Sequence, residues 1–177
     1  MKFLETKIQG VYVIELKREE DERGFFARSF CQREFEERSI PMRAAQCNVS
    51  GNKFKGTLRG MHYQEAPFEE EKIVSCVKGR IYDVTVDLRK DSPMNLQWFG
   101  IELSADNHTA LYIPKGCAHG FQTLENDSIV LYVMSEYYSS KHSQGVRWND
   151  PVLNISWPLF NPILSDKDSH WPLLPRQ

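Results

Sequence analysis

The sequence predicts an all-β protein, and the residues alone favour a sandwich, a barrel or a jelly roll. Short β-branched or aromatic runs recur at close spacing, and turn residues bound them. The run "IYDVTVDL" alternates, so even positions from Tyr82 to Leu88 share one face and odd positions from Ile81 to Asp87 share the other. Only one segment has clear helical character. The pattern therefore indicates many short strands around a common core.

The expected elements follow one another along the chain. Strands are predicted at 11–16, 55–64, 73–77, 81–88, 96–103, 110–113 and 128–138. Turns are predicted at 78–80, 89–93, 104–107, 114–116 and 124–128. The segment "CQREFEERSI" (31–40) is the one predicted helix, with Phe35 as its apolar side. The proline- and aromatic-rich tail from Trp157 onward is expected to pack across the barrel as irregular coil.

Composition sets the class of protein. The chain has 177 residues, 41% of them hydrophobic and 26% charged, with a formal net charge of -2. This near-balance gives no electrostatic reason to expect a nucleic acid or a membrane as partner, and the length suits a single domain over 1–177. There is no apolar run of about 20 residues and no apolar signal-peptide core. The cysteines, which form no CxxC pair, are expected to be reduced. They are Cys31, Cys47, Cys76 and Cys117. A cytoplasmic protein is predicted.

The stretch "KGTLRGMHYQ" (55–64) raises the first question of function. Strict alternation would send Arg59 and His62 to opposite faces of their strand. Gly60 lies between them, and a glycine inside a strand often marks a bulge that re-aims a side chain. A bulge there would turn both side chains toward one cavity. The plainer alternative is a surface arginine and a hydrogen-bonded core histidine.

Further polar residues are candidates, each with an ordinary alternative. Lys72 follows the acidic run "FEEE" and could be a snorkelling edge residue. His119, in "IPKGCAHGF", could be a turn histidine, and Tyr132 could be a filler aromatic. The motif "SDKD" places Asp166 and Asp168 in an apolar tail, where solvent exposure is the default.

These residue types form a coherent chemical set. A neutral histidine backed by a carboxylate is a general base near neutral pH, and a tyrosine opposite it can serve as the acid. A lysine beside both can stabilise an oxyanion. Arginines suit a phosphate-bearing substrate, because they form bidentate charge-assisted hydrogen bonds. No arrangement of a serine or cysteine nucleophile is evident.

Seven blocks in order carry a resemblance to a known family. They are "DERGFFARSF", "QCNVSGNKFKGTLRGMHYQ", "KIVSCVKGRIYDVTVDLRKDSP", "LYIPKGCAHGFQTL", "VLYVMSEYY", "GVRWNDPVLNISWP" and "LSDKD". Over essentially the whole chain, they resemble the dTDP-4-dehydrorhamnose 3,5-epimerase family. The resemblance implies a cupin-type jelly roll and a homodimer. It also implies a reaction on a nucleotide-linked 4-keto-6-deoxyhexose without cofactor or metal, in the synthesis of surface polysaccharide or another deoxysugar product.

The same resemblance implies roles for individual residues. His62 would accept the proton, with Asp168 as its orienting partner, and Tyr132 would donate a proton on the opposite sugar face. Lys72 would stabilise the enolate. The remaining implied residues bind substrate: Arg23 and Arg59 hold the pyrophosphate, Gln46, Asn48, His119 and Lys167 bind the nucleotide sugar, and Phe26, Arg28 and Tyr138 line the site.

The chain departs from the family pattern at several positions. Arg28 stands where "RGxFxE" has a glutamate, and Ser143 stands where an acidic residue usually follows the "YY" block. The family's "QDNHS" reads "QCNVS", and the loop between Asn48 and Arg59 is one residue longer. The proposed base, acid and enolate stabiliser are retained. An epimerase that inverts a single carbon, or that acts on a CDP- or GDP-linked sugar, stays open as an alternative.

Two rivals come from other classes of protein. Many jelly rolls hold a metal through an HxH pair, a glutamate and a histidine in a "PxGxxH" turn, and "PKGCAH" supplies the last of these with His119. The second histidine of the HxH pair is Gln64 here, and an amide is a poor ligand for a transition metal. The glutamate could be Glu69, Glu70 or Glu71. A non-catalytic sugar-binding jelly roll would need neither His62 nor Tyr132.

Overall fold

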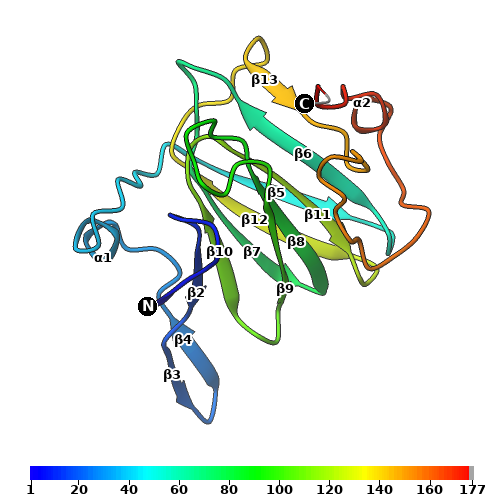
Figure 1. The fold of residues 1–177 in the computed structure, drawn as a ribbon. Coiled ribbons are helices and arrows are strands. Elements are labelled where there is room, and N and C mark those ends of the chain that lie inside the picture. Colours follow the sequence, from blue (N-terminus) through cyan, green and yellow to red (C-terminus); the bar gives the residue numbers. More distant parts are fainter. Residues whose placement is uncertain (176–177) are drawn as a thin grey trace.

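Two antiparallel β-sheets form the body of the protein (Figure 1). The computed structural model describes residues 1–175. The six-stranded sheet consists, in spatial order, of β1 Lys2–Glu5, β2 Tyr12–Glu15, β10 Thr109–Ile113, β7 Lys72–Lys78, β12 Ser128–Met134 and β5 Gln46–Asn52. The five-stranded sheet consists of β13 Ser143–Gly145, β6 Leu58–Gln64, β11 Cys117–Thr123, β8 Arg80–Asp87 and β9 Trp98–Ser104. The predicted all-β jelly-roll fold is confirmed.

The remaining elements are short. Strands β3 (Arg18–Asp21) and β4 (Gly24–Ala27) form a hairpin that protrudes from one end of the molecule (Figure 1). Helix α1 (Gln32–Glu36) is the predicted helix in shortened form, and α2 (Asp166–Ser169) lies in the tail. Among residues 1–175, none of the helices is long and apolar enough to cross a membrane.

Each strand predicted from an apolar run is present, although the ends differ. The run predicted at 128–138 stops at Met134, for example. The sequence analysis missed β1, β5, the β3–β4 hairpin, β11 and β13. The hairpin and β5 are rich in polar residues, so their hydrophobic pattern is weak. They are strands because their backbones pair with a neighbour.

The principal core lies between the two sheets. Val74 and Leu111 from the six-stranded sheet pack with Ile81 and Phe121 from the five-stranded sheet, and all four are essentially buried. Alternation then sends the other residues of each strand outward. On β8 the predicted division of faces holds, because Ile81 belongs to this inner cluster whereas Val84 and Val86 belong to a cluster on the outer face.

Both outer faces are partly covered by irregular segments. Phe35 of α1 packs on Ile14 and Tyr112, outside the six-stranded sheet. On the other side, Trp157 and neighbouring tail residues pack against Val84 and Val86. The tail therefore crosses the outside of the barrel as predicted, and this packing brings the carboxyl-terminal segment next to β6.

Strand β6 carries the predicted bulge. His119 of β11 pairs with His62, but Phe121, two positions further on, pairs with Arg59, three positions back. One extra residue is therefore inserted in β6 around Gly60, whose φ is +144°. A Cβ atom at Gly60 would lie 2.5 Å from the Cα of Gly120. Only glycine fits this crossing of two backbones.

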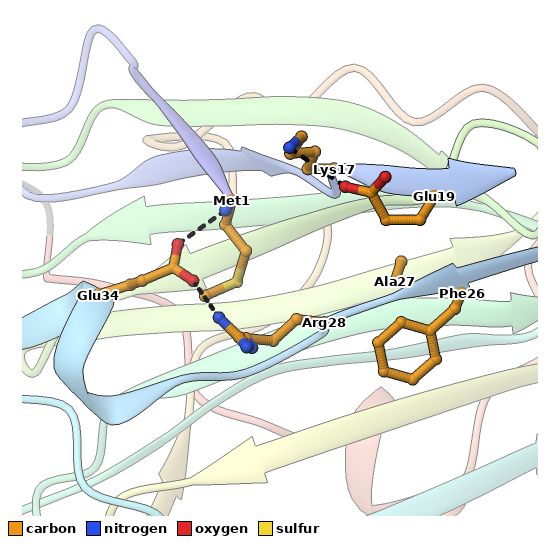
Figure 2. Close-up of a pocket in the computed structure, with 7 residues that line it drawn as sticks. All are labelled: Met1, Lys17, Glu19, Phe26, Ala27, Arg28 and Glu34. Atoms are coloured by element: carbon orange, nitrogen blue, oxygen red, sulfur yellow. Dashed lines mark hydrogen bonds and ion pairs between the residues drawn. The ribbon is translucent and has the colours of Figure 1, made fainter.

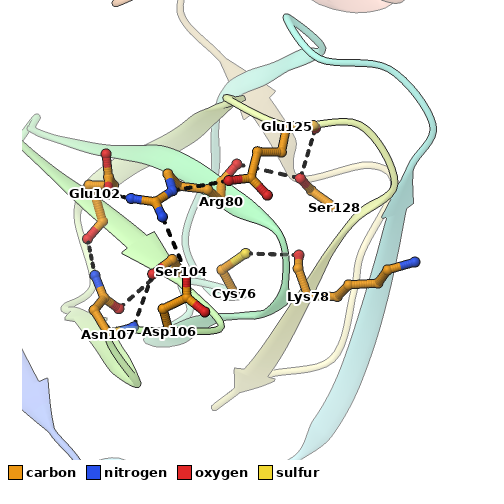
Figure 3. A network of polar contacts seen from close by, with 9 residues as sticks. All are labelled: Cys76, Lys78, Arg80, Glu102, Ser104, Asp106, Asn107, Glu125 and Ser128. Atoms are coloured by element: carbon orange, nitrogen blue, oxygen red, sulfur yellow. Dashed lines mark hydrogen bonds and ion pairs between the residues drawn. The ribbon is translucent and has the colours of Figure 1, made fainter.

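A polar network closes the strand ends around Arg80 (Figure 3). Its guanidinium contacts Glu102 at 2.5 Å and both Glu125 and Asp106 at 3.2 Å. Ser104 and Asn107 bond to each other's backbone and side chain in the adjoining turn. Exposed ion pairs each add little stability, so the network serves chiefly to hold β9 and two turns next to β8.

We expect Gly60→Ala to lower the free energy of unfolding by about 3 kcal/mol, because the methyl group meets backbone and the φ is strained for any L side chain. Urea denaturation measures the loss. Gly51→Ala is the matched control, since its Cβ would meet no atom within 4 Å. Equal stabilities for the two variants would contradict the role assigned to the bulge.

Candidate active site

A cavity of about 340 Å³ opens at the end of the barrel where β6, β7 and β12 meet the tail. We call it the candidate pocket. Its wall includes six of the residues singled out from the sequence: Arg59, His62, Lys72, Tyr138, Lys167 and Asp168. The other lining residues are Tyr63, Gln64, Glu70, Met134, Ser143 and Ser165. Arg59 and His62 thus face one cavity, as the bulge at Gly60 predicts.

The shortest polar contact in the candidate pocket joins His62 to Asp168. The Nε2 atom of His62 lies 2.5 Å from Oδ1 of Asp168. An ionised carboxylate can only accept, so Nε2 carries the proton and Nδ1 is left with its lone pair. Ser165 caps α2 by accepting a hydrogen bond from the Asp168 amide at 3.0 Å. The short helix thereby aims the carboxylate at the imidazole.

Asp168 stays ionised although it is buried. Its side chain is 6% exposed. Burial raises the pKa of Asp168, but the hydrogen bond and charge of His62, helped by Ser165 and Trp171, outweigh burial and hold that pKa below its ordinary value. By contrast, Asp166 two positions earlier is 97% exposed, as its sequence predicts. The pair formed by His62 and Asp168 is a base with a permanent anion behind it.

Lys72 is held next to His62 by an ion pair and a hydrogen bond. Its Nζ atom lies 2.9 Å from Glu70 Oε1 and donates to the carbonyl oxygen of His62 at 3.1 Å. The lysine and the glutamate are both nearly buried. An ammonium has three N–H donors and one is used for the carbonyl oxygen, so an N–H remains for an oxygen in the pocket. Lys72 is therefore neither a surface cation nor a snorkelling edge residue.

Tyr132 approaches from the opposite sheet. It lies on β12 and packs edge-on against His119, with 6.0 Å between the ring centroids. His119 in turn pairs in register with His62 across β11 and β6. Burial, and then the charge of Asp83, raise the pKa of the Tyr132 hydroxyl, against a smaller effect of Arg59. The phenol therefore keeps its proton at neutral pH.

A second imidazole–carboxylate pair lies deeper in the barrel. Nε2 of His119 is 2.8 Å from Oδ1 of Asp83, and both side chains are almost completely buried. Burial raises the pKa of Asp83, while His119 and Lys72 act in the opposite direction. Its Oδ2 atom is buried without a hydrogen-bond partner in the part of the chain that the structure describes. The alternation of the strand predicted that Asp83 shares a face with Ile81, but it did not indicate that this face is the inner one or what Asp83 would contact.

Gln46 and Asn48 extend the site along β5. They pair in register with Met134 and Tyr132 of β12, so they share the inward face of the sheet. The Gln46 side chain accepts a hydrogen bond from the Tyr138 amide at 3.0 Å. This contact ties the rim segment that carries Tyr138 to the edge of the sheet.

Seven predicted site residues do not line the candidate pocket: Arg23, Phe26, Arg28, Gln46, Asn48, His119 and Tyr132. The first three of these lie on or next to the protruding hairpin. Arg23 lies on the protruding hairpin and contacts Asp21, and Phe26 on the same hairpin is 75% exposed. Arg28 is turned to Glu34, which also accepts from the amino group of Met1 (Figure 2). Within one chain, the fold does not bring these three residues to His62.

Trp171 is a pocket neighbour that the sequence analysis missed. Its indole Nε1 donates to Oδ1 of Asp168 at 3.2 Å, and its ring meets His62 edge-on at 6.1 Å. The only sequence signal is its position three residues after Asp168. A tryptophan in a proline-rich tail is typical of a residue that packs on the barrel, so no sequence pattern indicated that it belongs to the site.

The donor set of the metal-binding alternative is not assembled. Both ends of the Gln64 amide bond to backbone groups, among them the Phe68 carbonyl at 2.8 Å and the Ser139 amide at 2.6 Å. Glu71 accepts from the Tyr112 hydroxyl and Glu70 contacts Lys72. Over residues 1–175, no three His, Cys, Asp or Glu side chains gather as a metal site would require.

An imidazole on one sheet, a phenol on the other and a lysine next to the imidazole are a set of groups suited to proton transfer, here in a jelly-roll fold. The comparison with family models makes the class specific. The model described as dTDP-4-dehydrorhamnose 3,5-epimerase matches residues 5–176. The chain belongs to this family of isomerases, which act on a sugar nucleotide.

Individual relatives support the same family assignment. The dTDP-4-dehydrorhamnose 3,5-epimerase of Shigella flexneri is 44% identical over 169 residues, which cover 95% of this chain and 93% of the relative. The crystal structure of the Bacillus anthracis enzyme with TDP and PPi bound has a TM-score of 0.95 at 47% identity, covering 98% of this chain and 99% of that one. The structure of the Legionella pneumophila enzyme in complex with dTDP-4-keto-L-rhamnose has a TM-score of 0.92 at 40% identity. The match covers 97% of this chain and 92% of that one.

Replacement of Asp168 by asparagine should destabilise the protein in a pH-dependent way. The folded pKa of Asp168 lies below its ordinary value of 3.8, so its ionisation adds stability above about pH 4. That contribution is lost as the pH falls through the folded pKa. We expect Asp168→Asn to lower the free energy of unfolding by about 1 to 3 kcal/mol at pH 7, and the difference to shrink toward pH 3.

Urea denaturation from pH 7 to pH 3 measures this difference. Asp166→Asn is the matched control, because that carboxylate lies on the same helix and is 97% exposed. A constant difference across the pH range would show that the charge of Asp168 does not stabilise the fold.

Proposed function

We propose that this protein inverts C3 and C5 of dTDP-4-dehydro-6-deoxy-D-glucose to give dTDP-4-dehydro-L-rhamnose, with His62 as base and Tyr132 as acid. One observation carries the residue assignment: the two rings come from opposite sheets, and His119, which pairs with His62 and contacts Tyr132, links them. A base and an acid on opposite sides of one sugar carbon are what inversion requires. Family membership supports the substrate class.

The chemistry follows from the contacts. The ketone at C4 acidifies the hydrogens on C3 and C5, so the free Nδ1 of His62 can remove either as a proton. The electron pair left on carbon delocalises onto the C4 oxygen, where the remaining N–H of Lys72 stabilises it. Tyr132 then protonates the carbon from the other face. His62 releases the proton it took to solvent, and Tyr132 recovers one from solvent. Each cycle leaves the atoms and charge of the enzyme unchanged.

Several residues suit the nucleotide diphosphate. Asn52 accepts a hydrogen bond at 2.8 Å from Nε of Arg59, which orients the guanidinium and leaves its other N–H groups for phosphate oxygens. Lys167 lines the same pocket. Two cations in one pocket match a pyrophosphate. His119, Gln46, Asn48 and Tyr138 are proposed to bind the sugar and the base.

Inversion of a single carbon is the second candidate, because Ser143 lines the candidate pocket at the position where the family pattern is usually acidic. The same base and acid would serve it, so only the product distinguishes the two reactions. The substrate could then also carry a different nucleotide.

Solvent exchange tests the assignment. In heavy water with dTDP-4-dehydro-6-deoxy-D-glucose, we expect deuterium at both C3 and C5. His62→Asn should reduce exchange at both carbons by about 10² or more. Tyr132→Phe should reduce inversion far more than exchange, since proton removal is intact. NMR of the sugar reports each carbon.

Each outcome of this assay has one meaning. Deuterium at one carbon alone would favour the single-carbon candidate, and faster exchange with the CDP- or GDP-linked sugar would favour another nucleotide. Exchange by His62→Asn at the rate of the unsubstituted protein would refute the base. Phe160→Ala is a suitable control, because Phe160 is 93% exposed and does not line the pocket.

A homodimer would complete the site. The outward face of the six-stranded sheet exposes Val49 and Val77, and a 440 Å³ groove lined by Phe25, Val77 and Leu131 runs beside them. An apolar surface of this kind suits a protein partner. A second copy seated there would explain why Arg23 and Phe26 project away from their own pocket: the hairpin would reach the pocket of the partner.

Subunit mixing tests this arrangement. His62→Asn chains keep Arg23, and Arg23→Ala chains keep His62, so a hybrid dimer has one complete site only if the hairpin crosses between subunits. After unfolding and refolding equal amounts together, we expect about a quarter of the unsubstituted activity, since about half the dimers are hybrids. Light scattering should give twice the mass of one chain.

The control mixes His62→Asn with Tyr132→Phe, which both lie in the body of the chain and not on the hairpin. Whether or not the hairpin crosses, a hybrid of these two has no complete site. A monomeric mass, or no recovery in the first mixture, would contradict the shared site.

The cytoplasm is the proposed compartment. The four cysteines are free, as expected where thiols are kept reduced.

A further inference from the structure

We propose that Trp171 is a positioning residue that holds the Asp168 carboxylate against His62 and weakens its negative charge, which sets how strongly the imidazole retains a proton. The proposal deepens the proposed function, since it takes His62 as the base. It begins from a shared atom: the imidazole of His62 at 2.5 Å and the indole N–H of Trp171 at 3.2 Å both contact Oδ1 of Asp168.

The fold gives the indole a dedicated place. Gly145 of β13 pairs directly with His62, and a Cβ atom there would lie 2.3 Å from the Trp171 ring. Glycine at this position therefore allows the indole to lie against the strand next to the base. On the other side, the ammonium of Lys167 lies 4.9 Å from the centre of the indole.

The backbone around the indole is also fixed. The Arg147 side chain donates from Nε to the carbonyl oxygen of Trp171 at 2.7 Å, and the Arg147 amide donates to Pro172 at 3.1 Å. These bonds join the tail to the segment that follows β13. The indole is thus held from its ring and from its main chain, so its N–H has little freedom to leave Asp168.

The electrostatic consequence has a definite sign. A donor on a carboxylate oxygen stabilises the anion, and Trp171 is among the groups that hold the pKa of Asp168 low. The same donor reduces the negative charge that Oδ1 offers to a protonated imidazole. Without it, the His62 imidazolium should be more stable, and the ring should keep its proton to higher pH.

Other ionisable groups surround His62 and stay in place when Trp171 is changed. They are Arg59 on its own strand, Lys72 with Glu70 at the start of β7, the buried pair of His119 and Asp83 behind it, Tyr132 on β12, and Lys167 beside Asp168 on α2. Of the ionisable groups, Lys167, Asp168 and His62 itself lie against the indole. A substitution that keeps an aromatic ring and removes only the N–H therefore tests the shared oxygen.

Trp171→Phe keeps an aromatic ring beside Gly145 and removes the N–H. We expect the pH midpoint of the His62 ring signals, followed by NMR without substrate, to rise by about 0.3 to 1 unit. The acid limb of the deuterium-exchange profile should move by the same amount. The exchange kcat on the plateau should fall about three- to tenfold with little change in KM, because the carboxylate is less well aligned. Asp168→Asn should move the midpoint in the opposite direction.

Trp157→Phe is the matched control. The Trp157 N–H donates to the Trp148 carbonyl oxygen at 2.9 Å, and neither residue lines the candidate pocket. This variant should leave the pH midpoint of His62 unchanged.

If Trp171→Phe does not fold, Gly145→Ala tests the same contact by displacing the indole, and it should raise the midpoint too. An unchanged or lowered midpoint in the variant that folds would overturn the proposal. The NMR titration needs no substrate, so it tests this inference independently of the reaction. A failure of the proposed function would be seen instead as absent deuterium exchange by the unsubstituted protein.

Discussion

The hydrogen bond between His62 and Asp168 joins the five-stranded sheet to the carboxyl-terminal tail across 106 positions of the sequence. The rest of the site depends on this contact. The tail must cross the outer face of the barrel, turn back at Ser165 and present a short helix before the carboxylate can reach the imidazole. Packing of the tail against Val84 and Val86 therefore contributes to function as well as to stability.

A local irregularity makes the contact useful. The extra residue at Gly60 places Arg59 and His62 on the same cavity, so a guanidinium and an imidazole come from one strand. Two further glycines show the same principle of close approach. Gly120 lies under the bulge and Gly145 lies under Trp171, and at both positions a side chain would overlap its neighbour. The site is compact because backbone occupies space that side chains would otherwise fill.

Buried charge is the other constraint. Glu70 with Lys72 is an opposite-charge pair, and Asp83 with His119 is a carboxylate–imidazole pair; both are buried near the candidate pocket. Removing one partner from such a pair leaves a buried charge without compensation, which costs far more than the pair contributes. The pairs hold Lys72 and Tyr132 in defined surroundings, where an electrostatic effect on a developing enolate is stronger than it would be in water.

The sequence by itself determined the all-β class, the main strands, the bulge at Gly60 and the kinds of chemistry available, because alternation, turn residues and glycine act over a few neighbouring positions. Seven blocks of resemblance supplied the family, which the comparisons confirm. Only the tertiary structure decided that Asp168 is buried against His62, that Asp83 lies behind His119, that Trp171 shares an oxygen with the base, and that Arg23 and Phe26 lie away from their own pocket. Each of these depends on segments that are distant in sequence meeting in space, and no local pattern records which carboxylate, indole or imidazole will meet.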